Sequence, residues 1–313
     1  MTALPRILVL LATHNGEQFL AEQLDSVLNQ RGVEVSVVVS DDASTDGTLA
    51  ALDRYRGDGR VRVLEPGEFG SSAANFFRLV REVPAEEYDA IGFCDQDDIW
   101  MPWKLQRHYE LLSLSNGLDG RGPYAGVSSN VTAVQPDGTR QIVVKNQLQR
   151  QCDYAFESGG PGSTFLLRPE AYEFVREQLL VQNGPASLAN SHDWLFYALV
   201  RAHGWRWFID GESSVDYRQH GRNELGANEG LQQNWRRLRG IVAGTHHQDA
   251  LRIILACRPV AAGRTSAQLE WLYERVAACN FTSRLRLVRH MHRFRRRRRD
   301  QLALAATLVT GLW

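Results

Sequence analysis

The chain has 313 residues, of which 43% are apolar and 23% charged. This composition is ordinary for a globular protein, excludes disorder of the whole chain, and allows one large core with or without a small appendage. The formal net charge is zero, but 19 basic and 30 acidic residues lie up to Gly221, against 17 and 6 beyond it. The two parts therefore carry net charges of −11 and +11, and we expect them to face different surroundings.

The four cysteines, Cys94, Cys152, Cys257 and Cys279, are far apart and form no CxxC pair. Their spacing argues against a structural zinc site and a disulfide framework and favours a reducing cytoplasm. The first residues lack the basic leader and cleavage site of a secretory signal. No apolar stretch approaches the roughly 20 residues that a membrane span needs. We therefore expect a cytoplasmic chain that does not cross a bilayer.

Apolar runs and helical periodicities alternate over the first 94 residues. The pattern predicts strands at 7–12, 33–39, 61–64 and 90–94, and helices at 17–30, 48–56 and 72–83. Such alternation is typical of a doubly wound parallel sheet, whose ligand site lies at the carboxyl ends of the strands. Polar turns after the first, second and fourth strands should then line one edge of the sheet.

The pattern changes after residue 100, where helices and short strands no longer alternate regularly. We predict a helix at 100–115, strands at 124–134 and 141–144 joined by a hairpin, a glycine-rich loop at 158–163, an apolar segment at 164–167, helices at 170–181 and 193–203, and strands at 205–209 and 214–217. Beyond residue 221 the strand signal stops and arginine-rich helices follow. The sequence thus indicates an α/β domain over residues 1–222 and a helical region over residues 223–313.

Three carboxylates, Asp95, Asp97 and Asp98, follow the fourth predicted strand. They would repel one another there unless a cation or hydrogen-bond donors offset their charge. Mg or Mn, bound by one or two carboxylates and completed by substrate phosphates, suits this spacing. A solvated acidic loop that caps the next helix is the simpler alternative, but the position at the mouth of a parallel sheet favours a metal.

A second polar turn, residues 40–48, follows the second predicted strand. Its short side chains suit turn formation and capping of the next helix. Asp41 and Asp42 are equally well placed to accept a hydrogen bond from a nucleotide base or ribose. Spacing alone leaves both interpretations open.

Three motifs together, residues 12–17 (ATHNGE), 40–48 (SDDASTDGT) and 95–100 (DQDDIW), resemble the family 2 glycosyltransferases of GT-A fold, in particular their bacterial rhamnosyltransferase-like members. The resemblance covers roughly residues 5–225. It implies a GT-A fold, which is Rossmann-like with a mainly parallel sheet and flanking helices, followed here by the C-terminal helical region.

The resemblance also implies roles for individual residues. Asp42, with Asp41 beside it, matches the carboxylate that reads the pyrimidine base, Asp95 would lie near the ribose, and Asp97 would ligate the metal. Asp98 either orients a ligand from behind or caps the next helix. The implied nucleotide-sugar site consists of Thr13, Asn15, Glu17, Asp41, Asp42, Asp95, Gln96 and Arg218.

Two later segments complete the implied site. The sequence SHDWL at 191–195 resembles the family's acidic pair at the start of a helix near the acceptor, with His192 in place of the commoner first acid. Asp193 would be the catalytic base, although an aspartate at a helix start is more often a cap. In YRQHGRN at 217–223, His220 is the candidate metal or diphosphate ligand, and Arg218 or Arg222 could pair with phosphate oxygens. A polar surface loop is the alternative there.

The glycines of the 158–163 loop either allow the backbone to approach a sugar or make the loop flexible.

Residues 284–299 contain nine arginines and two histidines interleaved with apolar side chains. A basic amphipathic helix on an anionic membrane surface has this pattern. A solvated helix packed on the catalytic domain is the alternative. Nucleic acid is not expected as a partner, because no recognition fold accompanies the charge and the pI is near 7.

These residues together predict an inverting, metal-dependent glycosyltransferase. By resemblance, the donor is dTDP-L-rhamnose, and the acceptor is a lipid-linked or growing cell-surface glycan such as an O-antigen or exopolysaccharide. A UDP-sugar donor and a non-catalytic sugar-binding protein are the alternatives. A nucleotidyltransferase or dehydrogenase fits less well, because no glycine-rich phosphate loop follows the first strand. The expected location is the cytoplasm or the inner face of the membrane.

Overall fold

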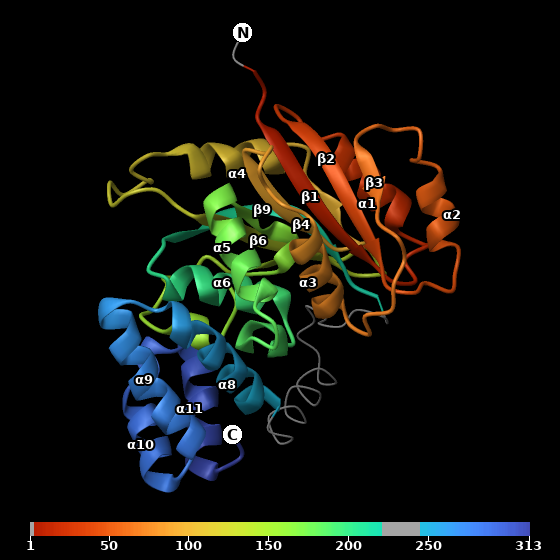
Figure 1. The fold of residues 1–313 in the computed structure, drawn as a ribbon. Coiled ribbons are helices and arrows are strands. Elements are labelled where there is room, and N and C mark those ends of the chain that lie inside the picture. The colour runs from red at the N-terminus through yellow and green to blue at the C-terminus, as the bar shows by residue number, and fades with distance from the viewer. Residues whose placement is uncertain (1–2, 221–244) are drawn as a thin grey trace.

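A computed structural model describes residues 3–220 and 245–313. In this part of the chain, one mixed sheet has the strand order β3-β2-β1-β4-β8-β6-β9-β5, and β7 pairs with β6 (Figure 1). The strands are β1 Arg6–Thr13, β2 Glu34–Asp41, β3 Val61–Val63, β4 Ala90–Cys94, β5 Ile99–Trp100, β6 Gly126–Val134, β7 Arg140–Val143, β8 Leu166–Leu167 and β9 Trp207–Arg218.

Helices flank the sheet and form the C-terminal part. They are α1 Leu20–Leu28, α2 Thr48–Asp53, α3 Ser72–Glu82, α4 Lys104–Ser113, α5 Pro169–Leu180, α6 His192–Ala202, α8 Thr245–Cys257, α9 Gly263–Ala278, α10 Phe281–Arg289 and α11 Arg298–Thr310, with 3₁₀ turns at η1 Asp153–Ala155, η2 Gly162–Thr164, η3 Pro185–Leu188, η4 Arg258–Val260 and η5 Met291–Arg293. The predicted domain boundary between residues 222 and 223, and Arg222 itself, lie outside the described residues.

The N-terminal half of the sheet is parallel, as the sequence predicts. β1 pairs in parallel with β2 and β4, with Thr13 opposite Asp41 and Leu11 opposite Cys94. The three strands therefore end side by side, and the polar turns that follow them meet at one edge of the sheet. Local alternation of strands and helices was sufficient to predict this half.

The alternating side chains of the strands belong to two cores on opposite faces of the sheet. Leu8 and Leu10 of β1 pack into a core with α3, α5, α6 and the C-terminal helices. Ile7 and Val9 pack into the other core, with α1, α2 and α4. Full burial of each such side chain stabilises the fold by about 1.5–3 kcal/mol, so a one-residue slip of β1 would be strongly unfavourable.

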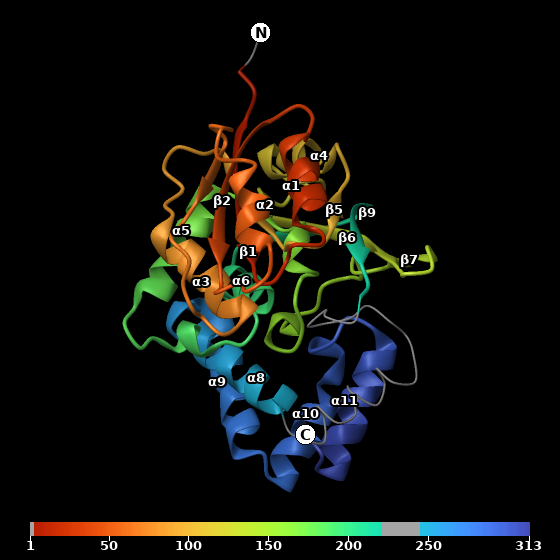
Figure 2. The same cartoon turned by 90° about the vertical axis from the view of Figure 1, so that its right-hand side faces the viewer.

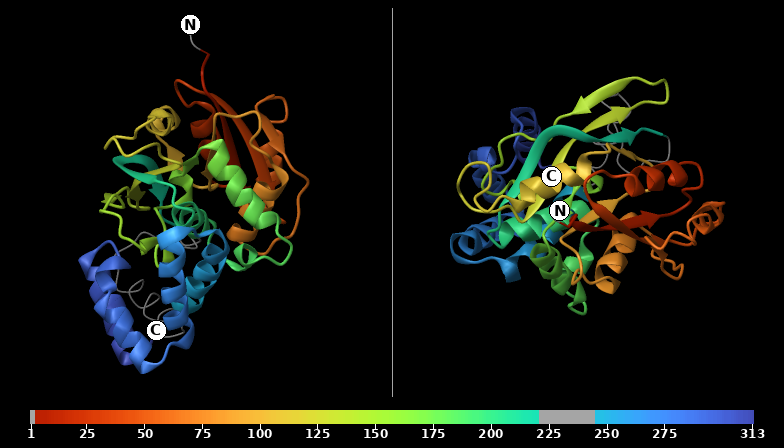
Figure 3. Two further views of the ribbon diagram at one scale, coloured as in Figure 1. Left: turned by 60° about the vertical axis from the view of Figure 1, so that its left-hand side comes forward. Right: turned by 90° about the horizontal axis from the view of Figure 1, so that it is seen from above.

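The second half of the sheet is mixed, and here two predicted elements differ from the structure. Trp100 is not in a helix: with Ile99 it forms β5, which pairs antiparallel with β9, and α4 begins only at Lys104. The two predicted strands at 205–209 and 214–217 are one strand, β9, whose parallel pairing with β6 is interrupted by register shifts. Both differences arise from pairing between distant segments. The predicted hairpin is confirmed, and its end with β7 extends outward from the rest of the sheet (Figure 2, Figure 3).

Helices α8 to α11 form a lobe at the end of the molecule opposite the N-terminus (Figure 1, Figure 2). The arginine-rich segment 284–299 is not one amphipathic helix, because α10 ends at Arg289 and α11 begins at Arg298, with η5 between them. None of the described helices is long and apolar enough to cross a membrane.

A buried cluster of charges joins the lobe to the sheet domain. The Arg296 Nε lies 3.7 Å from Asp153 Oδ2 and 3.4 Å from Glu157 Oε1, and its side chain is only 3% exposed. Arg201 of α6 lies 3.4 Å from the other Asp153 oxygen. Burial raises the pKa of Asp153, and the two arginines oppose that rise. Arg296 is thus the cation that Asp153 and Glu157 share, and Arg201 is a second partner of Asp153.

Replacement of Arg296 by Met should therefore lower the free energy of unfolding by about 3 kcal/mol, because removing one partner of a buried ion cluster leaves uncompensated charge. Denaturant unfolding followed by circular dichroism would measure the change. The matched control is Arg298→Met, at an exposed position two residues further along, which should change stability by less than about 0.5 kcal/mol. Equal stability of the two variants would disprove that Arg296 stabilises the contact between the lobe and the sheet domain.

Candidate active site

The loops that follow β1 and β2 are bound to each other by hydrogen bonds. Gly47 N donates to Glu17 Oε2 over 3.0 Å, Thr45 N donates to Asn15 Oδ1 over 2.8 Å, and Gly16 N donates to Thr48 Oγ1 over 2.7 Å. Because each bond joins a backbone amide to a side chain of the other loop, the two loops form one rigid wall. Asn15 and Glu17 therefore hold this wall together, whatever they contact in addition.

Gln96 connects the same wall to the end of β4. Its Oε1 accepts from Thr13 Oγ1 at 2.6 Å and from His14 N at 2.8 Å, and its Nε2 donates to His14 O at 2.8 Å. Gly16 is necessary for this contact, because a Cβ there would lie 2.2 Å from Gln96 Oε1. The amide of Gln96 thus positions the edge of the sheet.

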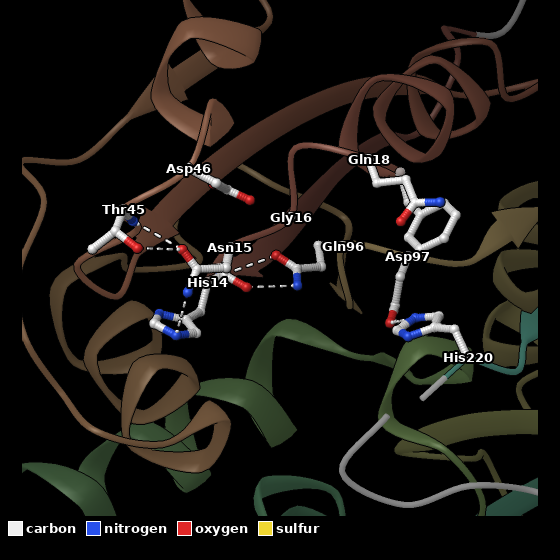
Figure 4. A pocket seen from close by; sticks show the side chains of 10 residues that line it. His14, Asn15, Gly16, Gln18, Thr45, Asp46, Gln96, Asp97 and His220 are labelled. Carbon is white, nitrogen blue, oxygen red and sulfur yellow. Dashed lines mark hydrogen bonds and ion pairs between the residues drawn. The ribbon is translucent and has the colours of Figure 1, made fainter. Parts of the chain in front are cut away.

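These loops enclose a cavity of about 680 Å³ at the predicted edge (Figure 4). Four of the predicted site residues line it: Asn15, Gln96, Asp97 and His220. The other lining residues, for which the sequence predicts no individual role, are His14, Gly16, Gln18, Phe19, Thr45 and Asp46. His14, Gly16, Thr45 and Asp46 lie in the polar turns, which is the signal that could have found them, whereas Gln18 and Phe19 lie within the predicted helix 17–30.

Asp97 and His220 meet in this cavity although 123 residues separate them (Figure 4). His220 Nε2 lies 2.8 Å from Asp97 Oδ2, and the imidazole stacks on Phe19 with ring centroids 5.0 Å apart. A carboxylate and an imidazole that converge in this way suit a divalent metal such as Mn. Among the described residues no third His, Cys, Asp or Glu completes a metal-binding group, so further ligands would have to come from substrate and water.

Arg218 lies next to this pair. Its guanidinium forms an ion pair with Glu22 and sits 4.9 Å above the Phe19 ring. Its backbone amide donates to Asp98 Oδ1 over 3.3 Å. The residue therefore orders the rim of the cavity through several contacts of its own, and its contact with a nucleotide sugar stays a prediction.

Asp41 and Asp42 are buried at the end of β2 and do not line the cavity. Asp41 accepts from Ser44 N at 2.9 Å and from Ser44 Oγ at 2.6 Å. Asp42 Oδ1 accepts from the backbone amides of Phe69, at 2.5 Å, and Gly70, at 3.2 Å. The structure therefore shows the hydrogen bonds of a turn, which is one of the two interpretations that the sequence left open. Recognition of a nucleotide base by either residue stays a prediction.

Three further predicted residues also lie beside the cavity and are absent from its lining. Thr13 is buried at the end of β1, Glu17 faces the second loop, and Asp95 is half-buried directly after β4. Their contact with a nucleotide sugar is likewise still a prediction.

Asp98 is fully buried behind Asp97, and it is not a helix cap, because Trp103 occupies the position before α4. Burial raises the pKa of Asp98 well above its usual range, and the charges of Asp97 and Asp95 raise it further. The Ser163 hydroxyl and the Arg218 amide partly oppose that rise. Of the two roles left open for Asp98, this position permits that of a group behind the candidate metal ligand, Asp97.

The glycine-rich loop, residues 158–163, packs between Asp98 and the start of α6. A Cβ on Gly162 would lie 2.3 Å from His192 Nε2, and a Cβ on Gly159 would lie 2.7 Å from the Tyr197 ring. The next residue, Ser163, contacts Asp98. These glycines therefore permit close packing against α6, and their approach to a sugar stays a prediction.

Asp193 stands in the first turn of α6, where Ser191 is the N-cap. Its Oδ1 accepts from Trp194 N at 2.6 Å and from the Ser191 hydroxyl. The neighbouring His192 is 8% exposed, stacks on Phe76 with centroids 3.8 Å apart, and has no hydrogen-bond partner for Nε2 among the described residues. Burial lowers the pKa of His192 to about 4, so at neutral pH it adds no charge beside Asp193.

A sequence model of glycosyl transferase family 2 matches residues 8–175. The chain belongs to this family. It is 36% identical over 231 residues to the dTDP-rhamnosyl transferase RfbG of Shigella flexneri, a match that covers 73% of this chain and 78% of that protein. The chain is therefore a rhamnosyltransferase-like family 2 glycosyltransferase, as the three motifs predicted.

A second relative is the UDP-Glc:alpha-D-GlcNAc-diphosphoundecaprenol beta-1,3-glucosyltransferase WfgD of Escherichia coli. It is 25% identical over 170 residues, which cover 54% of this chain and 65% of that protein.

Solved structures confirm the GT-A type of fold. TarS residues 1–349 of S. aureus, in complex with UDP-GlcNAc, align with a TM-score of 0.56 and 14% identity over 98% of this chain and 90% of that one. The mannosyltransferase PcManGT of Pyrobaculum calidifontis, in complex with GDP-Man and Mn2+, aligns with a TM-score of 0.55 and 18% identity over 100% of this chain and 88% of that one. At these identities the likeness concerns the fold alone.

The buried His192 predicts a pH dependence of stability. Between pH 6.5 and pH 4 the imidazole of His192 binds a proton in the unfolded chain but stays neutral in the folded protein. The free energy of unfolding should therefore fall by about 3 kcal/mol as the pH falls through this window. Above pH 6.5 the residue is neutral in both states and contributes no slope. Denaturant unfolding at several pH values would show a smaller slope for His192→Gln than for the wild type. The control, His292→Gln at an exposed site, should keep the wild-type slope, and an unchanged slope in His192→Gln would contradict the assignment.

Proposed function

We propose that this glycosyltransferase is inverting and metal-dependent, and that it transfers L-rhamnose from dTDP-L-rhamnose to a cell-surface glycan. The observation that carries the proposal is the meeting of Asp97 and His220 in a cavity at the carboxyl edge of the sheet. The similarity to a dTDP-rhamnosyl transferase over most of the chain supports the choice of donor. A UDP-sugar is the second candidate, because WfgD is named for a UDP-glucose donor.

The cavity is suited to the diphosphate of a nucleotide sugar. Asp97 and His220 would hold the divalent metal, Mg or Mn, and Asp95 would contact the ribose. A metal bound there supplies positive charge that offsets the charge developing on the departing nucleoside diphosphate. Thr13, Asn15, Glu17, Gln96 and Arg218 keep the two loops and the rim in place. Asp41 and Asp42, buried at the end of β2, would accept a hydrogen bond from the nucleotide base.

Asp193 would act as the base that takes the proton from the attacking hydroxyl of the acceptor. One oxygen, Oδ1, is held by the start of α6, which fixes the orientation of the carboxylate. The neutral His192 beside it does not compete for the proton, because its pKa is lowered to about 4. Attack by the hydroxyl on the face opposite the leaving group inverts the anomeric centre without a covalent intermediate.

The proposal predicts that dTDP-L-rhamnose binds with Mn present and loses its affinity in EDTA. Isothermal titration calorimetry should show at least about tenfold weaker binding for Asp97→Asn and His220→Ala, because each variant loses a direct metal ligand. UDP-glucose and UDP-N-acetylglucosamine serve as comparison donors. Tighter binding of a UDP-sugar would replace the rhamnose assignment, and no binding of any donor by folded protein would support a non-catalytic sugar-binding role.

The variant Asp193→Asn separates catalysis from donor binding when both donor affinity and donor hydrolysis are measured. It should bind the donor within about twofold of the wild type and lose metal-dependent donor hydrolysis by at least about a hundredfold, because only the base is removed. An active Asp193→Asn enzyme would overturn the base assignment and leave the donor site intact.

The C-terminal lobe supports attachment of a cytoplasmic enzyme to the inner face of an anionic membrane, where a lipid-linked acceptor would lie. Five arginines of the segment 284–299 are exposed on the lobe, together with apolar side chains of α10 and α11: Arg286, Arg289, Arg293, Arg298, Arg299, Phe281, Leu285, Leu302 and Val309. Exposed arginines bind anionic lipid with about 1 kcal/mol each. The protein should therefore sediment with vesicles of phosphatidylglycerol and not of phosphatidylcholine, and equal recovery with both would refute this attachment.

A further inference from the structure

Phe19 lies between the loop after β1 and the candidate metal ligand His220. It is the N-cap residue of α1, and its backbone amide donates to Gly16 O over 3.1 Å. Gly16 belongs to the rigid wall, because its own amide donates to Thr48 Oγ1 over 2.7 Å. The Phe19 side chain is half-buried and lines the cavity. The ring therefore reaches the cavity from a backbone that is anchored to the wall.

Two side chains at or just after the end of β9 lie against the Phe19 ring. The His220 imidazole stacks on it with ring centroids 5.0 Å apart and an interplanar angle of 26°. The Arg218 guanidinium lies 4.9 Å from the ring centroid and forms an ion pair with Glu22, one turn further along α1. Stacked rings at this distance attract each other, and so do a guanidinium and an aromatic face. The start of α1 thus contacts the end of β9 through side chains alone.

The backbone of the same segment is held separately, by the sheet. The Gln219 amide donates to Val134 O of β6 over 2.9 Å, which continues the pairing of β6 with β9 past Arg218. This bond places the backbone before His220 but does not fix the two rotatable bonds of the imidazole. The stack with Phe19 restricts both of them. The sheet therefore places the His220 backbone, and the Phe19 ring orients its imidazole.

Both candidate metal ligands are thus held by the same wall. Asp97 follows Gln96, whose amide is bonded to the loop after β1. His220 lies on Phe19, whose backbone amide is bonded to Gly16 of that loop. As a result, His220 Nε2 lies 2.8 Å from Asp97 Oδ2 (Figure 4). Groups that are held close together in advance lose less freedom when a ligand binds.

We propose that Phe19 is a positioning residue for the metal site: its ring holds the His220 imidazole in the orientation that directs Nε2 toward Asp97. The inference rests on the proposed function, because that function assigns the metal to this pair. Phe19 offers the metal no ligand atom, so its contribution passes through His220. Loss of the ring should therefore release the imidazole while the hydrogen bonds of the sheet keep the backbone in place.

The first test measures the binding of Mn to the full-length protein in the presence of dTDP by isothermal titration calorimetry. Phe19→Leu keeps an apolar side chain and removes the ring, so Mn should bind about three- to tenfold more weakly. Phe19→Tyr keeps the ring and should bind Mn within about twofold of the wild type.

The matched control for this test is Phe174→Leu. The Phe174 ring is half-buried and also packs on a histidine, His203, with centroids 4.4 Å apart, but neither residue lines the cavity. The same substitution there removes the same ring and the same kind of contact. Phe174→Leu should therefore bind Mn like the wild type.

A double-mutant cycle separates positioning of His220 from a general structural role of Phe19. If the ring acts through the imidazole, Phe19→Leu should change Mn affinity by less than about twofold in a protein that already carries His220→Ala. Equal losses in the two backgrounds would mean that Phe19 acts on the wall or on the nucleotide, and would overturn the proposal.

The orientation of the imidazole is measured separately, by NMR of protein without metal or nucleotide at constant pH. Histidine labelled with carbon-13 in the ring provides the His220 signal, which is assigned as the one that His220→Ala lacks. Because a stacked aromatic ring shields the imidazole protons, Phe19→Leu should move this signal toward that of an exposed histidine. Phe174→Leu should leave it in place.

The proposal would be overturned if the wild type bound Mn and Phe19→Leu bound it equally well, or if Phe19→Leu left the His220 signal in place. Failure of the proposed function would look different. The wild type would then bind no Mn while Phe19→Leu still moved the His220 signal, which would remove the metal from the proposal and support the orientation of His220 by Phe19.

Discussion

Mutual repulsion of three carboxylates at the end of β4 is the constraint on which the site depends. Asp95, Asp97 and Asp98 lie within four residues, and the fold places their side chains in different surroundings. Asp98 is buried, and its raised pKa together with the Arg218 amide makes that burial tolerable. Asp97 faces the cavity and His220. The separation leaves one carboxylate directed into the cavity with the imidazole of His220 beside it, an arrangement that suits a divalent cation.

The remaining walls serve to keep that carboxylate in position. Gln96, between two of the aspartates, is bonded at both ends of its amide to the loop after β1. That loop is bonded in turn to the loop after β2 through Glu17 and Asn15. A preorganised polar edge of this kind pays its ordering cost during folding, so less is lost when a ligand binds.

Sequence reasoning predicted the parallel half of the sheet and the edge where the polar turns meet, because both follow from local alternation and from the geometry of parallel strands. It missed β5 and the continuity of β9, because these depend on pairing between residues 99–100 and 215–216, which no local pattern encodes. The motifs located Asp97 and His220 but not Phe19, whose stacking on His220 requires the fold. Likewise, the tight contacts of Gly16 and Gly162 are properties of neighbours distant in sequence.

The arginine-rich segment shows why charge alone does not determine a role. A segment with nine arginines predicts a basic surface, yet Arg296 is buried against Asp153, a carboxylate more than 140 positions earlier. Its neighbour Arg297 turns toward Val144 and Lys145, while Arg298 and Arg299 are exposed. Consecutive residues thus dock the lobe, bond the segment after β7 and face solvent. Because Arg296 and Arg297 are adjacent, any shift of the buried cluster must also move the guanidinium that bonds Val144 O, so packing of the C-terminal lobe and the position of the segment after β7 are mechanically linked.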